Sequence, residues 1–346
     1  MGIQMSNLNF SKINNILLND YNIVPKYISE INRGTANIFK VTTNENQYIL
    51  KEFSENRSVQ SIEKELNIIN YLATKNINVP QYIKTNNNKY YLENDNRIVI
   101  SQKFVDGYTM ENNSVDNYDK IIESATILGK ITKELKDYPE LDEGGFIQKN
   151  LSKESLNTGI GKMKQLIKNL NSDNPYKDKI RQDLNDKINI AEELLKTFDF
   201  NIINKLTVTN AHGDYSIQQL IYNDKKGTTV IDFETAKKLP IVWEVMRSYS
   251  YIDKEAKDGN LNIDTLANYF REFCKYVPLN NYDLEYASYI YLLQLSNSVF
   301  GYKEYNDDYT QNKLLKFAFF RTNLCRYLYK NSEKISAKLL EINKYI

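Results

Sequence analysis

The sequence contains a single histidine, His212, and two cysteines, Cys274 and Cys325, among 346 residues. A zinc site built from three histidines or four cysteines therefore cannot form within this chain, and a framework of several disulfides is excluded as well. Two isolated cysteines are typical of a protein in a reducing compartment, where a buried cysteine acts as a small apolar side chain.

An excess of charge of one sign is also missing, because 45 Lys and Arg residues face 44 Asp and Glu residues. No long basic run is present, which argues against a nucleic-acid tail or a polybasic membrane patch. The most apolar stretch, 286–300, is interrupted by polar residues and falls short of the roughly 20 residues of a transmembrane helix. Since the first residues lack the pattern of a signal peptide, we expect a cytoplasmic protein without nucleic-acid or membrane partners.

The first hundred residues alternate between strand and helix patterns. Three strand-like segments separated by short turns occupy residues 27–53. Apolar residues then recur at helical spacing over 62–72, with Ser61 as the candidate start of that helix. Two further strand-like segments lie near 89–93 and 98–104. The order predicts a small β-rich unit with one helix.

The remainder of the chain has mainly helical periodicity. Residues 118–135 carry apolar positions at helical spacing, and the region after 242 is rich in Tyr, Phe and Leu. We interpret most of these aromatic residues as core. A β-rich part followed by a longer α-rich part predicts two lobes, 1–104 and 105–346.

The stretch 211–238 carries the residues best suited to chemistry. His212 precedes Gly213 and Asp214, and a second carboxylate, Asp232, ends an apolar run that predicts a buried strand. A carboxylate at such a place is costly unless it meets a cation or a hydrogen-bond donor. Two acids on neighbouring segments can form the oxygen-rich cluster that Mg²⁺ prefers. A loop carboxylate can orient a hydroxyl group and accept its proton.

This arrangement resembles the aminoglycoside phosphotransferase/choline kinase family of protein-kinase-like phosphotransferases. The family pattern H-G-D-x-x-x-x-N is present as 212–214 with Gln219 in the place of Asn, and I-D-F/W-E/D is present as 231–234. The segment 243–247 falls where the family often has Y/W-D-L-A-R, with Glu244 in place of Asp. The resemblance implies a bilobal α+β fold, with a five-stranded antiparallel sheet plus one helix in the small lobe and a large, mainly helical lobe.

The same resemblance implies roles for individual residues. Asp214 would be the catalytic residue that positions the acceptor hydroxyl. Asp232 would hold Mg²⁺ bridging the phosphates of ATP (or GTP), together with the amide oxygen of Gln219. Lys51 looks like the strand lysine that contacts those phosphates, and Glu65 resembles the helix glutamate that orients it.

Two parts of the nucleotide-binding pattern are less distinct. The turn residues Gly34, Thr35 and Asn37 would lie over the phosphates, where close backbone approach requires a small residue. Gly34 stands alone in this turn, where a glycine-rich loop would have three glycines. Glu63, on a neighbouring helix face, is the alternative to Glu65.

The sequence therefore predicts a phosphotransferase that uses ATP and Mg²⁺ to phosphorylate a hydroxyl group of a small molecule. The alternative is a non-catalytic kinase-like protein with a structural or nucleotide-sensing role, such as those of the spore coat. Gln219 favours this alternative. The joint presence of Lys51, Asp214 and Asp232 opposes it, because a scaffold has no physical need for all three.

Overall fold

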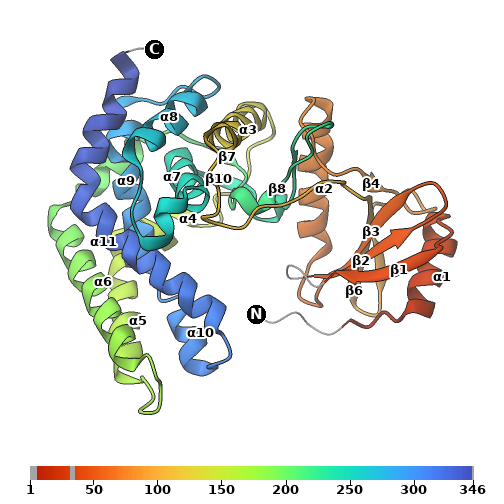
Figure 1. Cartoon of the computed structure of the whole chain (residues 1–346), viewed down its shortest axis with the longest axis horizontal. Coiled ribbons are helices and arrows are strands. Elements are labelled where there is room, and N and C mark those ends of the chain that lie inside the picture. Colours follow the sequence, from red (N-terminus) through yellow and green to blue (C-terminus); the bar gives the residue numbers. More distant parts are fainter. Residues whose placement is uncertain (1–5, 32–35, 345–346) are drawn as a thin grey trace. The chain divides into compact units, whose positions relative to one another are not determined.

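A computed structural model describes residues 6–31 and 36–344 (Figure 1). Contacts divide the chain into two compact units. The first consists of Met1–Thr109 with Gln219–Thr235, and the second of Met110–Gln218 with Ala236–Ile346. The division into a nucleotide-binding lobe at 1–104 and a catalytic and substrate-binding lobe at 105–346 stays a prediction.

The first unit is built around an antiparallel sheet with the strand order β1-β2-β3-β6-β4, in which β5 also pairs with β6. The predicted antiparallel sheet is confirmed, with six strands in place of five. The added strand, β4, has only two residues and is too short to produce an alternating pattern. The elements of this sheet and its helices are α1 Phe10–Tyr21, β1 Tyr27–Ile31, β2 Asn37–Thr42, β3 Gln47–Glu52, α2 Val59–Thr74, β4 Tyr82–Ile83, β5 Leu92–Asn94 and β6 Arg97–Lys103.

Helices cover both faces of this sheet, as Figure 1 shows for α1 and α2. Ile13 and Leu17 of α1 pack in one cluster with Leu50 of β3. Leu66 of α2 packs in a second cluster with Ile100 of β6. Since side chains alternate along a strand, the neighbours of Leu50 on β3 face the α2 side.

The start of α2 differs from the prediction. Ser58 is the N-cap residue, and its hydroxyl oxygen accepts a hydrogen bond of 3.2 Å from the backbone N–H of Ser61. Ser61 therefore lies inside the helix, because the cap is set by the first residue whose side chain can reach the free N–H groups. The buried face of α2 includes Ile62, Glu65 and Leu66.

A short hairpin from the middle of the sequence also belongs to the first unit. It consists of β8 Leu220–Ile221 and β9 Thr229–Val230, followed by the 3₁₀ turn Phe233–Thr235. The backbones of Tyr108 and Tyr222 exchange hydrogen bonds of 3.0 and 2.8 Å. The N–H of Val230 donates to the carbonyl of Asn78 at 2.9 Å. These bonds attach the segment around Asp232 to the first unit.

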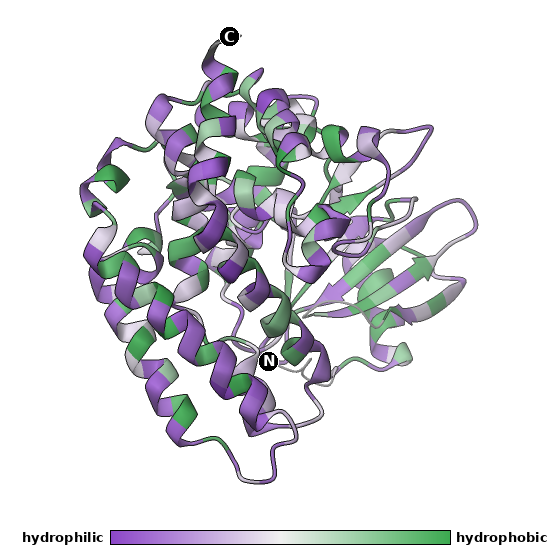
Figure 2. Cartoon of the chain, turned by 60° about the vertical axis from the view of Figure 1, so that its left-hand side comes forward, coloured by the Kyte–Doolittle hydropathy of each residue, from purple (hydrophilic) through white to green (hydrophobic). Residues whose placement is uncertain are grey.

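The second unit is mainly helical, as the sequence predicts. Hydrophobic and hydrophilic residues alternate along its helices (Figure 2), as expected where one face of each helix is buried. Its elements are α3 Tyr118–Lys136, α4 Phe146–Asn150, α5 Lys153–Lys168, α6 Lys177–Thr197, β7 Val208–Ala211, β10 Lys237–Pro240, α7 Ile241–Ile252, α8 Ile263–Cys274, α9 Asn281–Ser296, α10 Tyr302–Asp307 and α11 Asn312–Leu340. In the described part of the chain, the helices are all too short or too polar to span a membrane.

Candidate active site

The loop that follows β7 carries the predicted catalytic residue. Strand β7 pairs with β10, and β10 continues directly into α7, so the loop 212–215 lies against the first turns of that helix. Gly213 has φ 84°, a left-handed conformation that glycine adopts without strain. Asp214 follows with its side chain 40% exposed, and a substrate can therefore reach its carboxylate.

Glu244, on the first turn of α7, holds this loop through hydrogen bonds to its backbone. Its carboxylate is fully buried and accepts hydrogen bonds from the backbone N–H groups of His212 at 3.1 Å, Gly213 at 2.6 Å and Tyr215 at 3.3 Å. Burial raises the pKa of the Glu244 carboxyl, while the neighbouring His212 and these amide donors act in the opposite direction. Glu244 therefore fixes the backbone on both sides of Asp214.

Arg247 lies one turn further along α7 and forms an ion pair with Asp214. Its second terminal nitrogen donates to the carbonyl oxygen of Tyr215 at 3.0 Å. The guanidinium group lies over the ring of Tyr251, 4.6 Å from its centroid. Because Arg247 holds both the carboxylate and the backbone next to it, the orientation of Asp214 is fixed before any substrate binds.

The predicted nucleotide-binding residues lie in the first unit. Lys51 is on β3, directly opposite Ile100 of β6 and therefore on the α2 side of the sheet. Glu65 is buried on α2. Among the described residues the structure gives Lys51 no ion pair, and it does not bring Lys51 and Glu65 within salt-bridge distance.

Arg57, which the sequence analysis did not select, holds the Glu65 carboxylate instead. Its guanidinium forms an ion pair of 3.2 Å with Glu65 and a second ion pair with Glu234. Burial lowers the pKa of Arg57, and the carboxylates of Glu65 and Asp232 oppose that shift. Arg57 thus connects α2 to the segment 231–234. The chain has only eight arginines, and the planar guanidinium group is suited to pair with two carboxylates, so each arginine is a candidate for such a contact.

The two predicted magnesium ligands occur at the same end of the β8–β9 hairpin. The N–H of Ile231 donates to the carbonyl of Gln219 at 3.0 Å, which brings Gln219 beside the residue preceding Asp232. Asp232 has φ 71°, a sparsely populated conformation that is often found at functional positions. Its side chain is exposed. The described residues contain no group of three His, Cys, Asp or Glu side chains arranged for a metal ion.

This donor set fits Mg²⁺ bound together with a nucleotide. Mg²⁺ usually takes one or two protein oxygen ligands and completes its coordination with water and phosphate oxygens. Asp232 supplies an exposed carboxylate and Gln219 an amide oxygen. These two oxygens suffice for such a site, and no further acidic ligand is needed.

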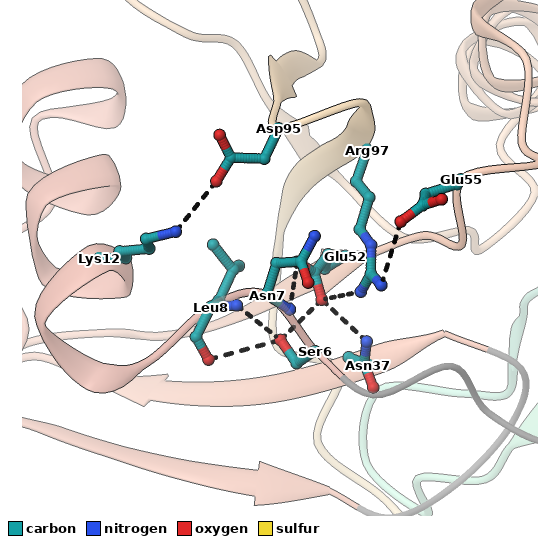
Figure 3. Close-up of polar contacts among 9 residues, drawn as sticks. All are labelled: Ser6, Asn7, Leu8, Lys12, Asn37, Glu52, Glu55, Asp95 and Arg97. Atoms are coloured by element: carbon teal, nitrogen blue, oxygen red, sulfur yellow. Dashed lines mark hydrogen bonds and ion pairs between the residues drawn. The ribbon is translucent and has the colours of Figure 1, made fainter.

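Asn37 takes part in a buried polar cluster around Glu52 (Figure 3). The Glu52 carboxylate is fully buried and accepts hydrogen bonds from the Asn37 side chain at 2.8 Å, Ser6 at 2.6 Å and Arg97 at 3.2 Å. The side-chain amide of Asn37 therefore donates to Glu52, and its backbone belongs to strand β2, which pairs with β3. Gly34 and Thr35, the other predicted loop residues, lie outside the described residues.

Comparison with models of protein families shows to which family the chain belongs. The model of the phosphotransferase enzyme family matches residues 28–276, which is more than half of the sequence. The chain belongs to the phosphotransferase enzyme family. The resemblance to aminoglycoside phosphotransferases and choline kinases is thereby confirmed. A search among curated proteins finds no match.

Solved structures of this phosphotransferase family share the fold. A spectinomycin phosphotransferase in complex with ADP and spectinomycin is similar over 95% of this chain and 100% of its own, with a TM-score of 0.66 and 14% identity. A microcompartment-associated aminopropanol kinase gives a TM-score of 0.62 at 13% identity, covering 96% of this chain and 100% of its own. Amicoumacin kinase in complex with AMP-PNP and Ca²⁺ gives 0.61 at 13% identity, over 94% of both chains. The bilobal α+β fold is thus confirmed.

Proposed function

We propose that the chain is a small-molecule kinase that transfers the γ-phosphoryl group of ATP to a hydroxyl group in a reaction dependent on Mg²⁺. The fixed orientation of Asp214 carries this proposal. An exposed carboxylate held by Arg247, on a loop whose backbone is held by the buried Glu244, is suited to orient a hydroxyl group. Nucleotide complexes of similar proteins, with ADP or AMP-PNP, support ATP as the phosphoryl donor.

Each side chain then has a distinct task. Asp214 orients the acceptor and accepts its proton as the acceptor oxygen bonds to the γ-phosphorus and the bond to the β–γ bridging oxygen breaks, which leaves ADP. Lys51 would contact the phosphates, while Asp232 and Gln219 would hold Mg²⁺. The metal, when bound, neutralises the charge on the phosphates. Positioning and charge neutralisation supply most of the rate enhancement in this class of reaction.

A second candidate function is a kinase-like protein that binds nucleotide without transferring phosphate. Gln219 favours it, because the extra methylene group displaces the amide oxygen and adds a rotatable bond relative to Asn. The support for Asp214 by Glu244 and Arg247 argues against it, since a scaffold gains nothing from an oriented, exposed carboxylate.

The experiment that separates the two is a phosphorylation screen with Mg·ATP over aminoglycosides, choline, sugars, amino alcohols and hydroxy acids. We expect Asp214→Ala to lower the transfer rate by about 100- to 10,000-fold, the usual contribution of a general base. Asp224→Ala, at an exposed position of the β8–β9 hairpin, is the matched control and should not change the rate. Stabilisation by Mg·ATP without transfer to any hydroxyl compound would favour the scaffold.

A further inference from the structure

Arg321, on α11, is a buried cation with an incomplete set of partners. The residue is 9% exposed. Its terminal nitrogens donate to the side-chain oxygens of Gln294 at 3.0 Å and Ser298 at 3.4 Å, and both of these partners are neutral. Its Nε is buried and has no hydrogen-bond partner.

The other well-buried arginines of the described chain, unlike Arg321, are paired with carboxylates. Four have side chains between 3% and 25% exposed, and each forms an ion pair with at least one carboxylate. They are Arg57, Arg97, Arg247 and Arg326. Arg321 forms no ion pair with any described carboxylate. A buried charge without a counter-ion is strongly destabilising, so an anion from outside the chain would be a favourable partner for Arg321.

Arg321 is connected to the catalytic loop by a continuous series of ring contacts within the second unit. From Asp214, the series passes through its ion-pair partner Arg247 to Tyr251, whose ring centroid lies 6.0 Å from that of Phe317. The guanidinium of Arg321 lies 5.6 Å from the same Phe317 ring. Aromatic side chains therefore occupy the region between the two arginines.

The spacing of these residues places them on single faces of their helices. Arg247 and Tyr251 are four residues apart on α7, and Phe317 and Arg321 are four residues apart on α11. Phe300 contacts Phe317 with ring centroids 6.1 Å apart and is 44% exposed. The aromatic series therefore extends to the surface of the second unit.

A second buried basic side chain lies beside Arg321. Lys187, on α6, is 3% exposed and donates to the backbone carbonyl of Ser298, the residue whose hydroxyl accepts from Arg321. Burial lowers the pKa of Lys187 to about 7, and Arg321 acts in the same direction. A cationic group brought next to Arg321 would be repelled, whereas an anionic group would be attracted.

We propose that the acceptor of this kinase carries a carboxylate, which binds the Arg321 guanidinium while the rest of the acceptor packs on the aromatic side chains between Arg321 and Asp214. The proposal rests on the proposed function for the reaction and adds the chemical class of the acceptor. A carboxylate is favoured over a phosphate because a single guanidinium neutralises one negative charge and would leave the second charge of a phosphate buried without a partner.

The first test compares acceptors that differ only in this group. The pairs are 3-phenyllactate with 3-phenyllactamide, and D-glucuronate with D-glucuronamide, each assayed with Mg·ATP. We expect kcat/KM for at least one acid to exceed that of its amide by about 10-fold or more, as a charged hydrogen bond provides. Equal values for acid and amide, or a preference for amine-bearing acceptors, would overturn the proposal and leave the kinase function intact.

The second test changes Arg321 itself. Arg321→Gln should lower kcat/KM for the preferred acid by about 10- to 100-fold, mainly through KM, and leave the amide nearly unaffected. Arg321→Lys should restore part of the loss. Arg271→Gln is the control, since Arg271 on α8 also has an uncharged partner, Asn268, and no ion pair among the described residues. An equal effect on acid and amide would show that Arg321 is structural only.

Binding can be measured apart from catalysis. The acids at millimolar concentration should raise the melting temperature of the wild type without nucleotide and should not raise that of Arg321→Gln. If Arg321→Gln does not fold, the comparison of acids with amides in the wild type decides whether the acceptor carries a carboxylate. The proposal would be contradicted if none of the four compounds were phosphorylated and none raised the melting temperature. The kinase function itself fails if no hydroxyl compound of the wider screen is phosphorylated, or if Asp214→Ala leaves all phosphoryl transfer unchanged.

Discussion

The two units support their functional side chains in different ways. In the second unit, the loop 212–215 is held by two side chains of α7, because Glu244 accepts from three of its backbone N–H groups and Arg247 pairs with Asp214. In the first unit, Lys51 has no ion pair among the described residues, and Glu65 is held by Arg57. Under the proposed function, the acceptor side is organised in advance, and we propose that bound nucleotide completes the contacts of Lys51.

The largest expected effect comes from removing the support of the catalytic loop. Glu244→Ala removes the acceptor of three backbone N–H groups, and at about 1–3 kcal/mol for each unsatisfied donor we expect a loss of about 3–9 kcal/mol in the free energy of unfolding. Urea denaturation measures this loss. Glu244→Asp, which has the residue common in the family, should recover much of the stability. An unchanged urea midpoint in Glu244→Ala would mean that the loop does not depend on this carboxylate.

The next effect separates the two cations of the first unit. Arg57→Met removes the cation that pairs with the buried Glu65 carboxylate and should cost about 3–5 kcal/mol of stability. Lys51→Met should leave the melting temperature unchanged and lower kcat/KM for ATP by about 10- to 100-fold, because Lys51 acts only on bound phosphate. The two variants are controls for each other. The opposite pattern, with Lys51→Met the unstable protein, would contradict the comparison.

A pH-dependent effect tests the buried lysine of the second unit. The pKa of Lys187 is about 7 in the folded chain and near its ordinary value of 10.5 in the unfolded chain. Between these values the unfolded state binds one more proton, so stability should rise with pH by at most about 1.4 kcal/mol per unit and fall as the pH approaches 7. Lys187→Met should remove this slope. Parallel stability curves for both proteins between pH 7 and 9.5 would exclude the shift.

The smallest expected effect concerns the metal site. Gln219→Asn shortens the side chain to that of the family pattern and should lower the Mg²⁺ concentration required for half-maximal activity by a few-fold. A titration of activity with Mg²⁺ measures the change, with Gln218→Asn as the control on the neighbouring residue. An increase in the required concentration would show that the longer side chain fits this hairpin better.

Much of the first unit could be predicted from the sequence because strands and hairpin turns leave a local pattern. The strands at 27–53 and the helix over 62–72 were recognised on that basis. The sequence analysis does not predict helix α1, although its buried residues Ile13, Ile16, Leu17 and Tyr21 follow helical spacing, because the remaining positions are mostly polar. Strand β4 was missed because its two residues cannot alternate.

The candidate site was predictable to a similar extent. The segments around Asp214 and Asp232 carry motifs, so their residues could be selected from the sequence. The partners of those residues could not, because contacts such as that of Arg57 with Glu234 join positions far apart in the chain and leave no pattern of their own. Arg321 lies in an aromatic helix that the sequence predicts as core, where a charge gives no local signal.

The account depends on separate roles for the two aspartates, Asp214 toward the acceptor and Asp232 toward Mg²⁺. The most direct test is the rate of ADP formation from ATP as a function of Mg²⁺ concentration in the wild type, Asp214→Asn and Asp232→Asn. We expect Asp214→Asn to saturate at the wild-type Mg²⁺ concentration with a strongly reduced rate, and Asp232→Asn to require far more Mg²⁺. Saturation of Asp232→Asn at the wild-type Mg²⁺ concentration, or an unreduced rate in Asp214→Asn, would contradict the account.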